Sequence, residues 1–293
     1  MTSAEKKFPL GEKKFNKWLV SEYFKHGSVD EVLRKHKFDV PISYAQYQRV
    51  LDKRGVVKAA GPNSKLTETL DFLTKLAYEN IPFDKLYTRM PSSFRTSAAT
   101  LYRILSYMKE GVTRRMATAL VLTVAGGGKK ILVANDYSRS KSSFGKPYGS
   151  ISIPVSFSRL RDPREVAILR VLQQEVFTDL AVENRIPDII PLRPRPFMFL
   201  DIADVRVEVF HLILPKKLSK TNNFSSYKLK NYKFIEAASI LKLAEGRKLR
   251  IGAREAAEGY LKYLDLKKRN LSINPIYYKS QLNYRLSELG GYY

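Results

Sequence analysis

The chain of 293 residues contains no cysteine and only one tryptophan. Without cysteine the fold cannot rely on disulfides, and the absence of an apolar run of about 20 residues argues against a membrane-spanning helix. The stretch MTSAEKKFPLGEKKF also lacks the apolar segment of a signal peptide. We therefore expect an intracellular protein, cytoplasmic or nucleoid-associated, that has no membrane partner.

Histidine is scarce as well, with His26, His36 and His211 as the only three. Together with the missing cysteine and the absence of a Gly-x-Ser-x-Gly motif, this argues against zinc sites and the familiar hydrolase triads. His211 lies in an apolar, strand-like run and is predicted to be a core residue with a hydrogen-bond partner. No Gly-Lys-Ser/Thr follows Gly126 to Gly128, so these glycines predict a turn rather than a phosphate-binding loop. We predict neither a metal site nor a cofactor.

Positive charge is what the chain has in excess: 52 Lys and Arg against 28 Asp and Glu give a net charge of +24. Residues 1–120 hold 22 basic and 12 acidic side chains, residues 121–212 hold 13 and 10, and residues 213–293 hold 17 and 6. The nearly neutral middle predicts the core, and the basic ends predict a polyanionic partner. Nucleic acid is favoured over anionic lipid, because the sequence has no basic amphipathic helix with an apolar face rich in Trp and Leu.

The first 60 residues have a helical pattern. FNKWLVSEYFKH predicts a helix that ends at Gly27, and SVDE at Ser28 is a capping-box sequence that begins a second, short helix. SYAQYQRVLDKRGVVK predicts a third helix that ends at Gly55 and is followed by a strand-like run. Three helices with a tight turn between the second and third, then a strand, form the outline of a helix-turn-helix with a wing.

This pattern returns 54 residues later, where Asp84, Ser97 and Arg103 match Asp30, Ser43 and Arg49. We therefore predict an all-α domain over residues 1–115 made of two helix-turn-helix-like units. The third helix of each unit would meet base edges through Tyr44 and Gln46 or through Arg95 and Thr96. Phosphate contacts would come from Arg49, Lys53, Arg54, Arg103, Arg114 and Arg115. The alternative is that these residues form the solvated helix faces of an interaction module.

After Ala117 the pattern changes from helical to strand-like. MATALVLTV and KKILVAND flank AGGG and predict a hairpin. Next come SFGKPYGSISIPVSF, RDPREVAILRVLQQEVF, DVRVEVFHLILP, YKFIEAASILKLAEG and REAAEGYLKYL. This order, with GKP and DPREVAILRVLQQEVF as its short matches, resembles the Nudix hydrolase domain over residues 117 to 265. The resemblance implies an α/β domain with a mixed sheet.

The signature helix of that family reads Gly-x5-Glu-x7-Arg-Glu-U-x-Glu-Glu-x-Gly-U, where U is aliphatic and the glutamates hold divalent cations. Aligned through Pro163, its Arg-Glu-U-x-Glu-Glu positions fall on LRVLQQ at residues 169–174, with Val155 and Arg161 at the upstream Gly and Glu. This frame keeps no acidic ligand.

Shifted by one residue, Asp162, Arg170 and Glu175 fall on motif positions. The remaining two glutamates and the glycine are replaced by Val171, Gln174 and Phe177. At most one of the three clustered glutamates remains in either frame, so the resemblance implies a Nudix-like fold without Nudix hydrolysis. The basic residues around this helix suit a phosphate or RNA backbone better than a cation: Arg159, Arg161, Arg164 and Arg170.

The last third of the chain interleaves basic residues with tyrosines, as in surfaces that follow a phosphate backbone and stack on bases. Its candidate contacts are Lys216, Lys217, Lys228, Lys230, Arg247, Lys248, Arg250, Lys267, Lys268 and Arg269. The Nudix-like domain is predicted over residues 116–270, and residues 271–293 are predicted to be a basic, tyrosine-rich tail.

Taken together, the sequence predicts an α+β protein of two domains, an N-terminal all-α domain and a C-terminal α/β domain of Nudix type. The predicted function is non-catalytic binding of nucleic acid, RNA or DNA, through basic surfaces and helical repeats. One alternative is a divergent nucleoside diphosphate hydrolase that uses Glu175, Asp162 and Glu165. The other is a structural protein of a nucleoprotein assembly.

Overall fold

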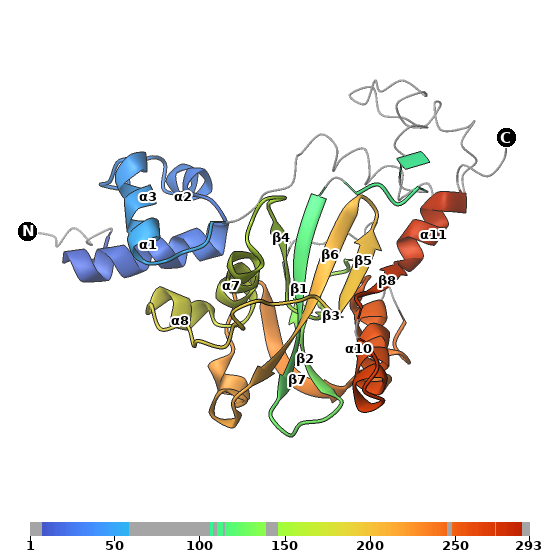
Figure 1. Cartoon of the computed structure of the whole chain (residues 1–293). Helices are drawn as coiled ribbons and strands as arrows, with labels where there is room; N and C mark the ends of the chain where they lie inside the picture. Colours follow the sequence, from blue (N-terminus) through green and yellow to red (C-terminus); the bar gives the residue numbers. More distant parts are fainter. Residues whose placement is uncertain are drawn as a thin grey trace, which may run out of the picture.

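The computed structural model describes residues 8–58, 106–107, 110–113, 115–138, 146–244, 248–272 and 274–288. A small helical unit at the N-terminal end lies beside a larger part built of sheets and helices (Figure 1). Most of the second predicted helix-turn-helix unit, including Arg95, Thr96, Arg103 and Arg114, lies outside the described residues, as does Arg247. In the described part of the chain no helix is long and apolar enough to cross a membrane.

The helical unit consists of α1 (Glu12–His26), α2 (Val29–Lys35) and α3 (Tyr44–Lys53). Local capping fixes the starts and ends that the sequence predicts. Gly27 ends α1 with φ 84°. The Ser28 hydroxyl accepts from the Glu31 amide at 3.2 Å at the start of α2, and Ser43 forms a capping box with Gln46 at the start of α3.

Two details of the helix-turn-helix prediction are wrong in this unit. The turn between α2 and α3 is not tight, because residues 36–43 connect the helices and both Lys37 and Phe38 have positive φ. The strand-like run after Gly55 forms no strand over residues 55–58, the last described before the gap. The backbone of this segment forms hydrogen bonds with the side chain of Gln173 instead. The segment therefore attaches to the second domain and does not form the predicted wing.

The second domain holds two sheets. The five-stranded sheet has the order β4 (Val155–Ser158), β1 (Arg115–Val124), β6 (Val205–Leu214), β5 (Met198–Ile202) and β8 (Ile276–Lys279). The three-stranded sheet has the order β3 (Ser150–Ser152), β2 (Lys130–Asp136) and β7 (Leu229–Glu236). Because β1 runs antiparallel to β4 and parallel to β6, the larger sheet is mixed, and the prediction of an α+β protein with a mixed sheet is confirmed.

The predicted hairpin between β1 and β2 does not form. The glycine turn is present, with Gly126 at φ 78° and Gly128 at φ 62°, but the two strands belong to different sheets. Both strands are buried along most of their length. Strands of this kind need other strands and helices around them, and β1 finds its partners in β4 and β6 while β2 pairs with β3 and β7.

Helices cover both faces of the larger sheet. On one face Leu120 and Leu122 of β1 pack in a core cluster with α7 (Arg164–Glu175), beside α8 (Thr178–Val182). On the other face the alternate residues Ala119 and Val121 pack in a cluster with α10 (Ala253–Lys268), beside α9 (Ala237–Ile240). This alternation of period two is what a strand buried on both faces produces.

The segment predicted as a basic tail belongs to the fold over much of its length. Strand β8 pairs in parallel with β5, and α11 (Gln281–Glu288) buries Leu282 and Leu286 against the domain. The prediction of a tail is therefore wrong for residues 276–288. Two short 3-10 helices, η3 (Lys216–Leu218) and η4 (Thr221–Asn223), connect β6 to β7.

Candidate functional site

A cavity of about 340 Å³ lies where the two sheets approach each other. One side is apolar and comes from strands of the larger sheet, with Ala117, Val155, Phe157, Val205 and Val207. The other side is polar and comes from six separate segments, with Asp136, Ser138, Lys146, Ser156, Glu175, Lys228 and Arg250. The cavity therefore offers an apolar wall and a charged wall to one ligand.

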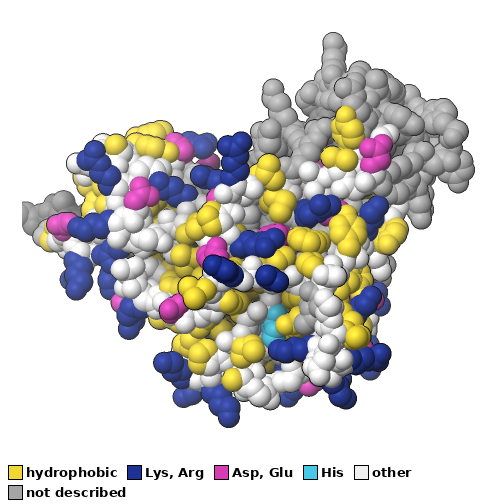
Figure 2. Space-filling view, in the orientation of Figure 1, with side chains coloured by type: hydrophobic (Ala, Val, Ile, Leu, Met, Phe, Trp, Pro, Cys, Tyr) yellow, Lys and Arg dark blue, Asp and Glu magenta, His cyan; other side chains and the backbone are white. Residues whose placement is uncertain are grey.

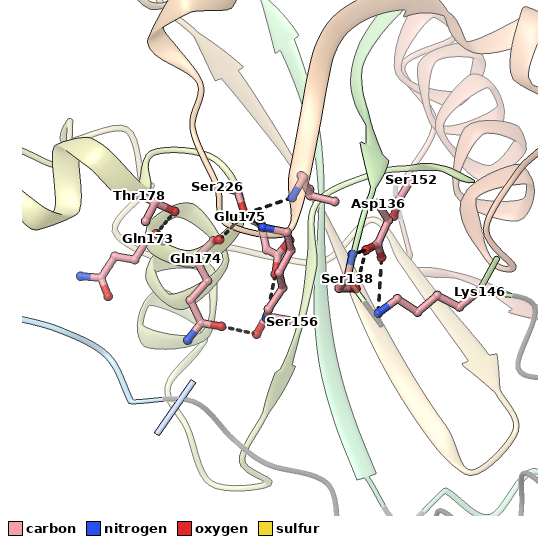
Figure 3. Close-up of polar contacts among 12 residues, drawn as sticks. Asp136, Ser138, Lys146, Ser152, Ser156, Gln173, Gln174, Glu175, Thr178 and Ser226 are labelled. Atoms are coloured by element: carbon pink, nitrogen blue, oxygen red, sulfur yellow. Dashed lines mark hydrogen bonds and ion pairs between the residues drawn. The ribbon is translucent and has the colours of Figure 1, made fainter. Parts of the chain in front are cut away.

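Asp136 is the centre of the first charged group. It ends β2 and is 2% exposed. The amide and hydroxyl of Ser138 donate to its Oδ1 at 2.9 and 2.5 Å, and Lys146 Nζ lies 3.5 Å from its Oδ2 (Figure 3). Arg250 Nη1 lies 3.1 Å from the same Oδ2. Burial acts to raise the pKa of Asp136, but the charges of Arg250 and Lys146 and the bonds from Ser138 outweigh it, and the pKa is lowered.

Glu175 is the centre of the second charged group. It is the last residue of α7 and is 4% exposed. Lys228 Nζ lies 3.3 Å from its Oε1, and its backbone carbonyl accepts from the Tyr232 hydroxyl at 2.8 Å. Burial raises the pKa of Glu175, and the charge of Lys228 only partly offsets this. A buried carboxyl with a raised pKa is typical of a functional site.

The two groups form one electrostatic cluster. Three cations, Lys146, Lys228 and Arg250, stand against two carboxylates, Asp136 and Glu175, which leaves one excess positive charge. Burial and the charge of Arg250 lower the pKa of Lys146, while Asp136 and Glu175 act to raise it. The cluster is thus positive overall, and it favours an anion.

The rim of the cavity holds a further ion pair. Arg115 at the start of β1 bonds to Asp204 through Nε at 2.9 Å and Nη2 at 2.5 Å. Its guanidinium also lies over the ring of Phe157, 5.4 Å from the centroid. Arg115 was predicted as a phosphate contact, and its partners place it at the apolar wall of the cavity.

Helix α7 carries the positions that a Nudix metal site requires. Arg170 Nη2 lies 2.6 Å from Asp162 Oδ2, so an ion pair joins two of the positions that match in the second alignment frame. Arg170 is 2% exposed and also donates to the Lys58 carbonyl at 2.8 Å. The prediction that Arg170 suits a phosphate or RNA backbone is therefore wrong, because the residue is buried with an acidic partner.

The two glutamines of this helix, Gln173 and Gln174, form hydrogen bonds with different parts of the chain. Gln173 points away from Glu175 (Figure 3) and bonds to the backbone of the connecting segment at Gly55 and Val57. Gln174 Oε1 accepts from the Ser156 hydroxyl at 3.0 Å. The amides at positions where carboxylates would hold metal thus fix other parts of the chain.

The helical unit contacts the second domain at further points near this helix. Lys17 of α1 pairs with Glu183 at 2.5 Å, and the Ser21 hydroxyl bonds to that of Tyr227. Tyr227 also lines an open hollow of about 520 Å³ with Asp179 and Lys230. This hollow is larger than the cavity, but its charged side chains are not gathered into a buried cluster, so the cavity is the stronger candidate site.

Most of the predicted nucleic-acid contacts that the structure describes are exposed, but they do not gather at one place. Figure 2 shows Lys and Arg side chains over both the helical unit and the second domain. The exposed ones are Tyr44, Gln46, Arg49, Lys53, Arg159, Arg161, Arg164, Lys216, Lys217, Lys230, Lys248, Lys267, Lys268 and Arg269. The half-buried ones are Arg54, Arg115, Lys228 and Arg250, of which the last three line the cavity.

Sequence reasoning missed two charged residues of the cavity, Asp136 and Lys146. Asp136 is the last residue of the largely buried strand β2, and Lys146 lies in the GKP match to the Nudix pattern. The sequence therefore contained a signal for each of these two residues. The prediction for His211 is confirmed. Its Nε2 lies 2.9 Å from Thr123 Oγ1, and burial together with the charge of Lys267 lowers its pKa to about 4.

No family model matches the sequence, and no curated protein matches it. Among solved structures, the MutT protein from Methanosarcina mazei Go1 is similar, with 11% identity, a TM-score of 0.37, and coverage of 52% of this chain and 96% of that one. A mutT/nudix family protein from Listeria innocua is similar with 16% identity and a TM-score of 0.37, and the match covers 54% of this chain and 99% of that one. An ADP-ribose pyrophosphatase from Streptococcus suis 89-1591 is similar with 13% identity and a TM-score of 0.36, and the match covers 57% of this chain and 99% of that one. The name of the Listeria innocua protein includes the family that the sequence resembles. The likeness is one of fold, and the function proposed below is argued from the side chains of this chain.

Proposed function

We propose that the cavity binds a nucleoside diphosphate or a related nucleotide. The observation that carries this proposal is the convergence of Lys146, Lys228 and Arg250 on one wall of a cavity whose other wall is apolar. Lysine and arginine are the usual partners of phosphate oxygens. A volume of about 340 Å³ falls in the range of small-molecule sites.

The apolar wall supports a ligand with a flat ring. Phe157, Val155 and Val207 give it a surface without charge, and Arg115 lies over the Phe157 ring at the same wall. A nucleobase has a π-face that such side chains bind by stacking and dispersion. The phosphates of the same ligand would then reach the charged wall.

The charged wall supports an anion for a second reason. The pKa of Glu175 is raised by burial, so its carboxyl takes up a proton more readily than an exposed glutamate does. The hydroxyls of Ser138 and Ser156 are additional donors on the same wall.

Hydrolysis of the ligand would have to involve Glu175. Of the three acidic residues that the hydrolase alternative names, Glu175 is the one that lines the cavity. Asp162 is engaged with Arg170 and with the Arg159 amide. The discriminating assay is release of phosphate or of a mononucleotide from a panel of nucleoside diphosphates with Mg²⁺, with Glu175→Gln as control.

Binding itself is tested by calorimetry with the full chain and the same panel. We expect Arg250→Met to weaken the affinity for the best ligand by at least about tenfold, because it removes a cation of the charged wall. Lys248→Met is the matched control, since Lys248 is exposed, two residues away and outside the cavity lining. Equal affinity of the two variants, or no binding by the wild type to any nucleotide, would contradict the proposal.

Nucleic-acid binding by the helical unit is a second candidate, favoured by the surface of α3. This helix buries Tyr47 and Leu51 and leaves Gln46 and Arg49 exposed on its other side, while Tyr44 is exposed in its first turn. A helix packed by one face with polar and basic residues on the other has the form of a groove-binding element. Gel-shift titration with duplex DNA and with RNA at several salt concentrations tests it, and binding that salt does not weaken would argue against it.

A further inference from the structure

At the three clustered glutamate positions of the Nudix signature, the helix that ends at Glu175 offers a divalent cation a single carboxylate. In the frame supported by the Arg170 ion pair, the other two glutamate positions of the Nudix signature hold Val171 and Gln174. Val171 is buried in the core, and the side-chain oxygen of Gln174 accepts from Ser156. Magnesium prefers hard anionic oxygens. These residues do not fit the cation that the resemblance implies.

The remaining carboxylate already has a cation of the chain beside it. Lys228 Nζ lies 3.3 Å from Glu175 Oε1, and Glu175 is 4% exposed. A divalent ion bound at this carboxylate would face the ammonium group at short range, where repulsion between like charges is strong in a buried setting. Asp136, the other carboxylate of the cavity, is engaged in the same way by Arg250 and Lys146.

We propose that Lys228 takes the place of the divalent cation, so that the cavity binds the diphosphate group of its ligand without a metal ion. The inference rests on the nucleotide-binding function proposed above and adds how the phosphate charge is neutralised. Glu175 holds Lys228 at the cavity wall, and the ammonium group supplies the point charge that phosphate oxygens require. Lys146 and Arg250 complete the positive wall.

The test is the affinity of the full chain for ADP, measured by calorimetry in excess EDTA and again in excess Mg²⁺. We expect equal affinity in the two conditions. Binding that occurs only with Mg²⁺ would overturn metal-free binding while leaving the nucleotide proposal intact. If neither ADP nor any other nucleoside diphosphate binds in either condition, both proposals fail.

Variants at Lys228 test the same inference independently. We expect Lys228→Met to lose at least about tenfold in ADP affinity in EDTA, and Lys228→Arg to retain most of it. Lys230→Met is the matched control, because Lys230 is exposed, lies two residues further along in β7 and does not line the cavity. The double variant Lys228→Met/Glu175→Gln removes both charges together and avoids a buried, unpaired carboxylate. The double variant should bind as weakly as Lys228→Met. Wild-type affinity of Lys228→Met or of the double variant in EDTA would refute the role of Lys228.

Discussion

Gln173 on helix α7 holds the backbone at Gly55 through its side-chain amide, with Nε2 donating to the carbonyl oxygen at 2.7 Å. At the same time its Oε1 accepts from the Val57 amide at 2.8 Å. An amide supplies a donor and an acceptor, whereas a carboxylate supplies acceptors alone. The glutamine thus attaches the connecting segment of the helical unit to the second domain, in a helix whose family pattern is rich in glutamate.

Gln173→Glu is therefore expected to loosen this attachment. The carboxylate keeps the bond from Val57 but faces the Gly55 carbonyl without a donor, at a cost of about 1–3 kcal/mol. The expected results are a lower free energy of unfolding in urea and faster proteolysis within residues 55–58.

Gln174→Glu is the control for this variant. Gln174 uses only its side-chain oxygen, as acceptor from Ser156, and a carboxylate preserves that bond. A loss of stability for Gln174→Glu as large as for Gln173→Glu would show that the added charge, and not the lost donor, is responsible.

Arg170→Met is expected to destabilise the second domain strongly. Arg170 is 2% exposed and pairs with Asp162 at 2.6 Å. Removing one partner of such a pair leaves a poorly solvated charge and costs about 3–5 kcal/mol. The double variant Arg170→Met/Asp162→Asn should recover part of this loss in urea denaturation, and strict additivity of the two single variants would contradict the coupling.

Local elements of this fold could be predicted from the sequence because their determinants are local. The capping residues Ser28 and Ser43 and the stop at Gly27 fix the helices of the N-terminal unit within a few residues. The apolar runs of β1 and β6 likewise predict strands. Which strands pair was not predictable in the same way, because one partner of β1 is β6, whose paired residues lie 90 positions further along the chain.

The candidate site was only partly predictable for the same physical reason. Glu175 could be found from the signature helix, but its role depends on Lys228, which is 53 positions away. Asp136 and Arg250 are 114 positions apart. Gln173 looked like a lost metal ligand, and its partners Val57 and Gly55 are 116 and 118 positions away. Such contacts follow from tertiary packing, which periodicity and spacing do not encode.

If α3 contacts nucleic acid, Arg49→Ala/Lys53→Ala should lower the affinity at every salt concentration. Both side chains are exposed on α3. Removing two phosphate contacts should reduce the slope of log affinity against log salt by about 2. Lys14→Ala is the control, because Lys14 is exposed on α1 of the same unit. An unchanged slope for the double variant would place the contact surface elsewhere.

Glu22→Gln should destabilise the helical unit more at neutral pH than in acid, because the charged Glu22 side chain connects α1 to the end of α2. Its Oε2 lies 2.8 Å from His36 Nε2 and 3.3 Å from His26 Nε2. Burial acts to raise the pKa of Glu22, but the His36 bond and the charge of Lys25 outweigh it, and the pKa is lowered. A lowered folded-state pKa stabilises the unit at pH values above the ordinary value for glutamate, about 4.3, and this contribution disappears as the pH falls through the lower, folded-state value.

The difference in unfolding free energy between wild type and Glu22→Gln should therefore be largest near neutral pH and shrink below about pH 4. Trp18 is the single tryptophan and its ring lies 5.1 Å from that of His36, so its fluorescence during urea unfolding reports on this unit directly. Glu12→Gln on the same helix is the control, because Glu12 is exposed. A difference for Glu22→Gln that stays constant from neutral to acid pH would mean that packing of the side chain, and not its charge, stabilises the junction of α1 and α2.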